Sequence, residues 1–186
     1  MALSTALPVE LLPAARDCPL PGGETAASCV PVTMSPQLVL ATSLPLDAIA
    51  IQDETTISIS TNTGRLMMRL REPATGPAMG YIIDDHGTPT LVASLDVYLD
   101  APDMRILTLT HDLHSKPLSI AVRGPVRFLA DGRIAIAASN VADVPMRVNI
   151  QGTDTSGPIS GAVKMVIPAG GLTLQLVSPP LRGGSR

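Results

Sequence analysis

Apolar and polar residues alternate along most of this chain, in segment after segment between Ile57 and Val177. The clearest runs are Leu118–Arg123, Met146–Gln151 and Leu172–Val177, in which every second residue is aliphatic. Successive side chains of a β-strand point to opposite faces of the sheet, so a period of two marks a strand with one buried face. The chain is therefore expected to fold as an all-β protein.

The composition supports this class and narrows the function. The 186 residues include 18 prolines and 15 glycines, which suits many short strands separated by turns. Aliphatic side chains must build the core, because the chain has two Tyr, one Phe and no Trp. So few aromatic residues argue against a platform that stacks sugars or single-stranded nucleic acid. The net charge of −3 and the scattered Lys and Arg predict no nucleic-acid partner.

Turn-forming residues separate the expected strands of the body. Asp131-Gly132 between two alternating segments predicts a hairpin that pairs Val126–Leu129 with Arg133–Ser139, and Gly124-Pro125 predicts a turn just before it. The other strands are expected at Leu38–Ala41, Ala48–Gln52, Thr56–Ser60, Arg65–Arg71, Met79–Asp84, Leu91–Leu99, Arg105–His111, Leu118–Arg123, Met146–Gln151, Gly161–Ile167 and Leu172–Val177.

The segment Asp131–Val177 resembles an immunoglobulin-like or fibronectin-like module. The resemblance rests on Asp131–Ile136, on Ser139–Pro145 with its Asn after a strand, and on Ile167–Gly171 before a last strand. The core Trp and the Cys–Trp–Cys spacing of antibody domains are missing. The resemblance implies an architecture and no specific activity. We expect an antiparallel β-sandwich, immunoglobulin/fibronectin-like or jelly-roll-like.

The sequence also aligns with itself at a shift of 68 residues. Gly64-Arg65 then falls on Gly132-Arg133, and Pro77 falls on Pro145. A true duplication would divide a body at 37–181 into two related halves, 37–115 and 116–181. Two all-β segments can also align by alternation alone. Residues 182–186 are expected to form a flexible tail.

Residues 1–36 form a Pro-rich N-terminal segment outside this alternation. Its two cysteines, Cys18 and Cys29, enclose a short loop, and a disulfide between them would stabilise the fold by roughly 2–3 kcal/mol. The alternative is a pair of free thiols, but neither residue lies in an apolar run where a free thiol would pack. We expect this segment to act as an arm that docks on neighbouring subunits through its apolar residues Leu3, Leu7, Val9, Leu11 and Leu12.

Candidate chemistry is sparse. His111, Asp112 and His114 are weak candidates for a metal site, because imidazole and carboxylate groups suit divalent ions, although a strand end or loop lacks the helical spacing that would bring them together. Gly157–Gly161 contains a serine but does not match the nucleophile motif Gly-x-Ser-x-Gly. The sequence therefore predicts no enzyme activity, no cofactor and no catalytic residue.

The sequence favours a non-enzymatic structural or assembly subunit. Copies of the chain or other subunits would be its partners, in a phage virion as a decoration, head or tail component, or in a bacterial surface structure. Neither a signal peptide nor a transmembrane segment is expected, since prolines interrupt the first apolar stretch. The location stays open between a virion, the cell surface or exterior, and the periplasm.

Two alternatives remain. The first is an envelope protein that holds a lipid or another apolar ligand inside a β-barrel or curved sheet. Methionines would give it an adaptable lining, although they could equally fill the core of a chain with few aromatic residues. The second is an accessory β-sandwich binding module of a larger complex. The candidate lining methionines are Met67, Met68, Met79, Met104, Met146 and Met165.

Overall fold

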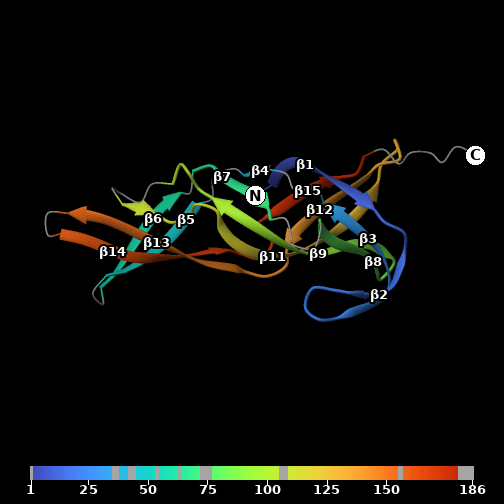
Figure 1. Ribbon diagram of the computed structural model, residues 1–186, viewed down its shortest axis with the longest axis horizontal. Helices are drawn as coiled ribbons and strands as arrows, with labels where there is room; N and C mark the ends of the chain where they lie inside the picture. The colour runs from blue at the N-terminus through green and yellow to red at the C-terminus, as the bar shows by residue number, and fades with distance from the viewer. Residues whose placement is uncertain are drawn as a thin grey trace, which may run out of the picture.

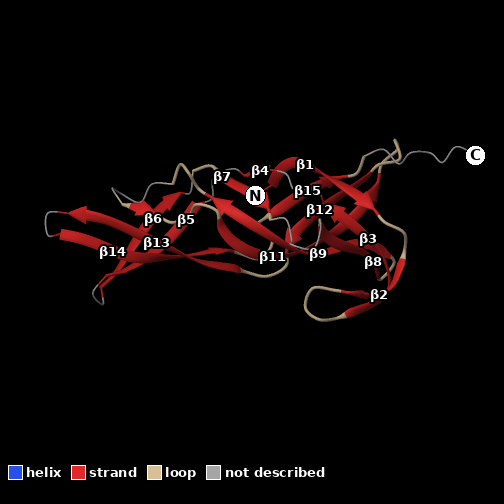
Figure 2. Cartoon of the chain, in the orientation of Figure 1, coloured by secondary structure: helices blue, strands red, loops and turns tan. Residues whose placement is uncertain are grey.

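The computed structural model confirms the all-β class. It describes residues 2–34, 38–41, 45–52, 55–62, 64–71, 77–104, 109–154 and 157–179, and this part of the chain contains fifteen strands and no helix (Figure 2). The strands are β1 (Ala2–Leu11), β2 (Ala15–Pro19), β3 (Thr25–Met34), β4 (Leu38–Ala41), β5 (Pro45–Gln52), β6 (Thr55–Asn62), β7 (Leu66–Leu70), β8 (Ala78–Asp85), β9 (Thr88–Asp100), β10 (Thr110–His111), β11 (Lys116–Phe128), β12 (Ile134–Asn140), β13 (Val144–Asp154), β14 (Gly157–Ile167) and β15 (Thr173–Val177).

The larger sheet has ten strands and curls until it closes on itself. Its order is β11-β12-β15-β1-β3-β8-β9-β7-β4, and β11 pairs with β9 as well as with β12. Seven strands therefore form a closed ring: β1, β3, β8, β9, β11, β12 and β15. β2 pairs with β3 outside this ring. All pairings in the sheet are antiparallel except that of β1 with β15.

The smaller sheet lies toward the opposite end of an elongated molecule from β2, β3 and β8 (Figure 1). Its order is β10-β13-β14-β5-β6, and all of its pairings are antiparallel. β13 and β14 form a long hairpin that runs from the pair Val144–Ile167 to the pair Asp154–Gly157. Buried residues of both sheets belong to one apolar core. The sandwich subtype and the two related halves stay predictions.

The core is aliphatic, as the composition requires. Along β9 every second side chain from Leu91 to Leu99 is almost fully buried, while Ser94 and Asp96 between them are exposed. Burial of such side chains is the main stabilising contribution, about 25 cal/mol per Å² of apolar surface. Several of the candidate lining methionines belong to this core: Met68, Met104, Met146 and Met165.

The turn expected at Gly124-Pro125 is wrong, because β11 runs through both residues without a break. Gly124 is needed there for close packing: a Cβ atom at this position would lie 2.1 Å from the carbonyl oxygen of Ala137 in β12. The neighbouring hairpin is confirmed, since Phe128 pairs with Ile134 across a turn in which Gly132 has a φ of 78°. Gly124-Pro125 therefore marks a close approach of two strands.

The N-terminal segment, which the sequence predicts to be a docking arm, pairs with strands of its own chain. Leu3 and Leu7 pair with β15, Leu11 pairs with β3, and the backbone N–H of Leu12 donates to the carbonyl of Pro31 at 2.9 Å. Val9 is only 1% exposed and belongs to the core. The chain itself offers β1 two sheet edges to pair with, those of β15 and β3. Part of the hydrogen-bonding capacity that would dock an arm on a neighbour is thus used within the chain.

None of the described residues forms a helix long and apolar enough to cross a membrane.

Candidate functional site

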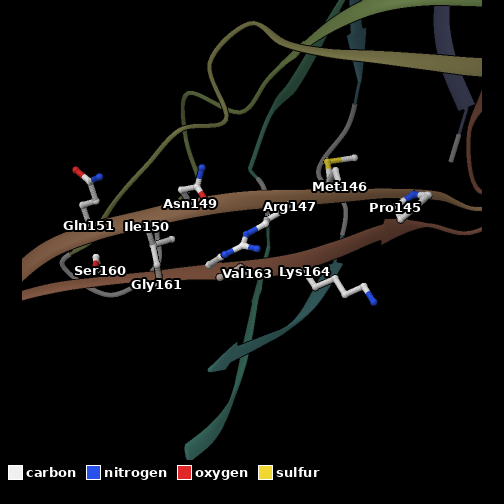
Figure 3. Close-up of a pocket in the computed structure, with 11 residues that line it drawn as sticks. Pro145, Met146, Arg147, Asn149, Ile150, Gln151, Ser160, Gly161, Val163 and Lys164 are labelled. Atoms are coloured by element: carbon white, nitrogen blue, oxygen red, sulfur yellow. The ribbon is translucent and has the colours of Figure 1, made fainter. Parts of the chain in front are cut away.

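A cavity of about 890 Å³ lies along the β13–β14 hairpin (Figure 3). The hairpin supplies its wall from both strands, and the greater part of that wall is apolar. The residues that line it are Pro145, Met146, Arg147, Asn149, Ile150, Gln151, Ser160, Gly161, Ala162, Val163 and Lys164.

Strand alternation divides these lining residues into two groups. Met146, Ile150 and Val163 are each at most 5% exposed and anchor the hairpin in the core. The outward-facing group is Arg147, Asn149, Gln151, Ser160 and Lys164, all of them exposed. The cavity thus combines a rigid aliphatic base with polar side chains that remain free to contact a ligand.

Two cations are cross-strand neighbours at the cavity. Arg147 and Lys164 are direct cross-strand partners in the hairpin ladder. Like charges at opposite positions of an antiparallel pair destabilise a sheet. Among the described residues neither side chain has an ion pair, whereas Arg65, Arg69 and Arg123 each contact an aspartate. The site therefore presents uncompensated positive charge.

Asp112 joins the neighbouring loop to this hairpin. Its Oδ1 accepts the backbone N–H of Asn149 at 2.8 Å, and its Oδ2 accepts Nδ2 of Asn149 at 2.7 Å and Nζ of Lys116 at 2.9 Å. Partial burial raises the pKa of Asp112, but the hydrogen bonds from Lys116 and Asn149 lower it more, so the net pKa lies below the ordinary 3.8. Asp112 acts here as a structural anchor.

The predicted metal candidates lie close together without forming a metal site. The rings of His111 and His114 stack with their centroids 4.8 Å apart, and Nδ1 of His111 accepts the N–H of Leu113 at 3.2 Å. The oxygens of Asp112 are engaged by Asn149 and Lys116. No group of three or more His, Cys, Asp or Glu side chains in the described ranges could hold a metal ion. The three residues order the loop before β11.

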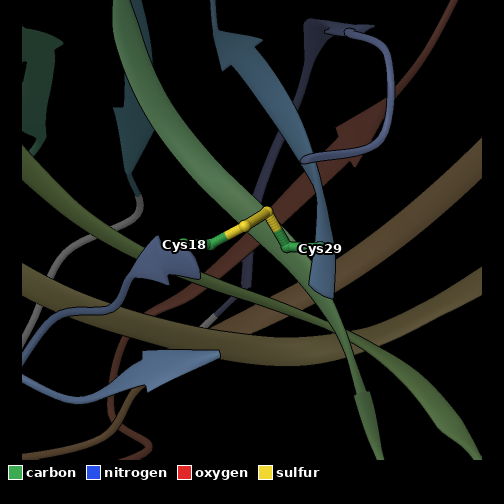
Figure 4. The surroundings of a disulfide bond; sticks show 2 residues. All are labelled: Cys18 and Cys29. Atoms are coloured by element: carbon green, nitrogen blue, oxygen red, sulfur yellow. A yellow bond between two sulfur atoms is a disulfide. The ribbon is translucent and has the colours of Figure 1, made fainter. Parts of the chain in front are cut away.

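The predicted disulfide is confirmed. Cys18 in β2 and Cys29 in β3 are bonded, with their Cα atoms 6.3 Å apart (Figure 4). Both residues are buried, at 2% and 5% exposed. Because β2 pairs only with β3 in the described part of the chain, this bond fixes a strand that has few other contacts. Structural disulfides of this kind are typical of oxidising compartments.

Sequence reasoning missed the cavity residues. The alternating pattern predicts Arg147 and Lys164 only as outward-facing positions of two strands. A signal was present, because each strand carries one cation within a largely neutral run, and a hairpin brings the two runs together. The register that sets the cations opposite each other follows from the ladder, in which Val148 pairs with Val163.

Comparisons with known proteins give one distant similarity. The chain is 25% identical over 182 aligned residues to Alkane uptake protein B of Marinobacter nauticus, an alignment that covers 86% of this chain and 16% of that protein. The chain therefore spans about a sixth of the length of the curated relative that it matches. No protein-family model matches the chain. No solved structure matches it.

Proposed function

We propose that this chain is a non-enzymatic binding module of the cell envelope that takes part in the uptake of apolar compounds such as alkanes. The observation that supports it most is the similarity to a protein named for alkane uptake, which extends over 86% of the chain. The β13–β14 cavity is the binding site in this proposal. This is the envelope alternative from the sequence, with the ligand beside a hairpin instead of inside a ring of strands.

Two structural features support the proposal. The Cys18–Cys29 disulfide suits a protein that folds outside the reducing cytoplasm. The cavity wall combines apolar surface, its greater part, with several polar side chains, and small-molecule sites combine the two in this way. A binding module needs no nucleophile or general base, so the sparse chemistry of the chain is adequate for this role.

Assembly with other subunits is the second proposal. Phe128, the only Phe of the chain, is 73% exposed at the end of β11. Phe is one of the aromatic residues that are enriched in protein–protein interfaces. This favours an accessory module in a larger complex over docking through residues 1–36, because β1 already pairs with β15 near its start and with β3 over Val9–Leu11.

Gene deletion tests the uptake proposal. The deletion strain should grow normally on acetate but slowly on hexadecane as the sole carbon source, and the wild-type gene supplied in trans should restore growth. Uptake of radiolabelled hexadecane by resting cells should fall in parallel, which separates entry from metabolism. Equal growth and equal uptake in the two strains would rule the proposal out.

A further inference from the structure

We propose that the β13–β14 cavity binds an amphiphile with an anionic head group and an alkyl chain, a long-chain carboxylate being the simplest. The role of this ligand in uptake rests on the proposed function, whereas its binding to the protein rests on the cavity alone. Arg147 and Lys164 would hold the head group, and the apolar wall would hold the chain.

The case for an anion comes from charge. Arg147 and Lys164 are opposite each other in the ladder, and no carboxylate among the described residues pairs with either. An anion between them would replace their repulsion by two attractions. A guanidinium group presents a planar fork that matches a carboxylate, and such charge-assisted bonds are roughly twice as strong as neutral ones.

The two cations have different roles. Figure 3 shows Arg147 lying across the hairpin, whereas Lys164 extends outward from β14. Arg147 would bind the head group from a fixed position. The flexible stem of Lys164 lets its ammonium group follow the ligand, as lysine commonly does.

The case for an alkyl chain comes from the rest of the wall. Pro145 and Ala162 lie on the same face of the hairpin as the cation pair, one on each side of it, and give the alkyl chain an apolar surface. From Arg147 to Gln151 the strand advances by about 13 Å, which a dodecanoate chain can span. Burying each CH2 group in such a groove strengthens binding by roughly twofold to fourfold.

A tryptophan reporter makes the test simple, because the chain has no Trp of its own. Gln151→Trp places the indole at the far end of the cavity from Arg147, at an exposed position. Dodecanoate is titrated below its critical micelle concentration and Trp emission is recorded. Dodecyltrimethylammonium, which has the same chain and the opposite charge, is the control ligand.

Three further variants in the reporter background identify the head-group site. Arg147→Gln should weaken dodecanoate binding about tenfold, and adding Lys164→Gln should weaken it further. Arg127→Gln is the matched control: Arg127 is exposed on β11, has no ion pair among the described residues, and lies outside the cavity lining. It should leave the affinity unchanged. Circular dichroism checks that each variant folds.

Four results support the inference: a blue shift of Trp emission with dodecanoate, a weaker effect of octanoate, a loss of affinity in the Arg147 and Lys164 variants, and weakening by added salt. It is overturned by an absence of dodecanoate binding, by equal affinity in the double variant, or by equal binding of the cationic ligand. If dodecanoate fails to bind but the deletion strain still loses growth on hexadecane, the proposed function survives and only this ligand class is wrong.

Discussion

Single residues hold the loops of this fold in place, and Asn140 is the clearest case. It is 2% exposed, and its Nδ2 donates to the carbonyls of Ala142 and Pro168 at 2.9 and 2.8 Å while its Oδ1 accepts the N–H of Leu172 at 2.8 Å. Asn140→Ala removes all three hydrogen bonds and should lower the free energy of unfolding by about 3 kcal/mol. Urea denaturation measures this. The neighbouring Val141→Ala, at a side chain 53% exposed, should cost less than about 0.5 kcal/mol.

Gly124 is the second residue with a specific requirement. A Cβ atom there would collide with the backbone of Ala137, which cannot move without separating β11 from β12. Gly124→Ala should therefore lower the free energy of unfolding by about 2–3 kcal/mol or more. Gly132→Ala is the comparison, because it meets no atom within 4 Å and should cost about 1 kcal/mol through its positive φ alone. Similar losses for both variants in urea denaturation would contradict this account.

At the scale of elements, Asp112 connects the loop before β11 to β13, and its ionisation makes this contact sensitive to acid. Its folded-state pKa lies below 3.8, through the opposed effects of burial and of the Lys116 and Asn149 hydrogen bonds. The carboxylate form therefore stabilises the fold above about pH 4, and the contribution is lost as the pH falls through the lowered folded-state pKa.

The matching experiment compares the melting temperature of wild type and Asp112→Asn from pH 7 down to about pH 3. Wild type should be the more stable protein at neutral pH, and the difference should shrink as Asp112 becomes protonated. Lys116, the ion-pair partner of Asp112, gives an independent check. In a Lys116→Gln background, the difference in melting temperature that Asp112→Asn causes at neutral pH should be smaller. A constant difference across this range would show that ionisation of Asp112 does not stabilise the contact.

The same scale shows what the sequence could predict. Alternation predicted β4 with its observed bounds and most other strands within a few residues, because a buried face leaves a local pattern. β11 was divided wrongly, since Gly124-Pro125 has the composition of a turn and its actual role depends on a strand distant in sequence. The cavity could not be predicted for the same reason. Predicting it requires the register of β13 with β14, since neither strand alone indicates that Arg147 and Lys164 are ladder partners.

For the molecule as a whole, the pairing of the two ends of the chain had no local signal at all. β1 lies parallel to β15 and antiparallel to β3, so it closes the ring between the last strand and the N-terminal third. Removing it would open two sheet edges and uncover the core around Val9. A chain that begins at residue 13 should therefore melt at a lower temperature and bind the dye ANS, which reports exposed apolar surface.

A peptide of residues 1–12 added in trans makes this prediction sharper. It should bind the shortened chain, raise its melting temperature and abolish ANS binding, because the edges of β15 and β3 are complementary to β1. The same peptide with Val9→Asp should fail, since Val9 is 1% exposed in the core. Full-length protein should not bind either peptide, as its ring is already closed. If the shortened chain were as stable as the full chain, β1 would be dispensable to the ring and the segment would be free to act as a docking arm.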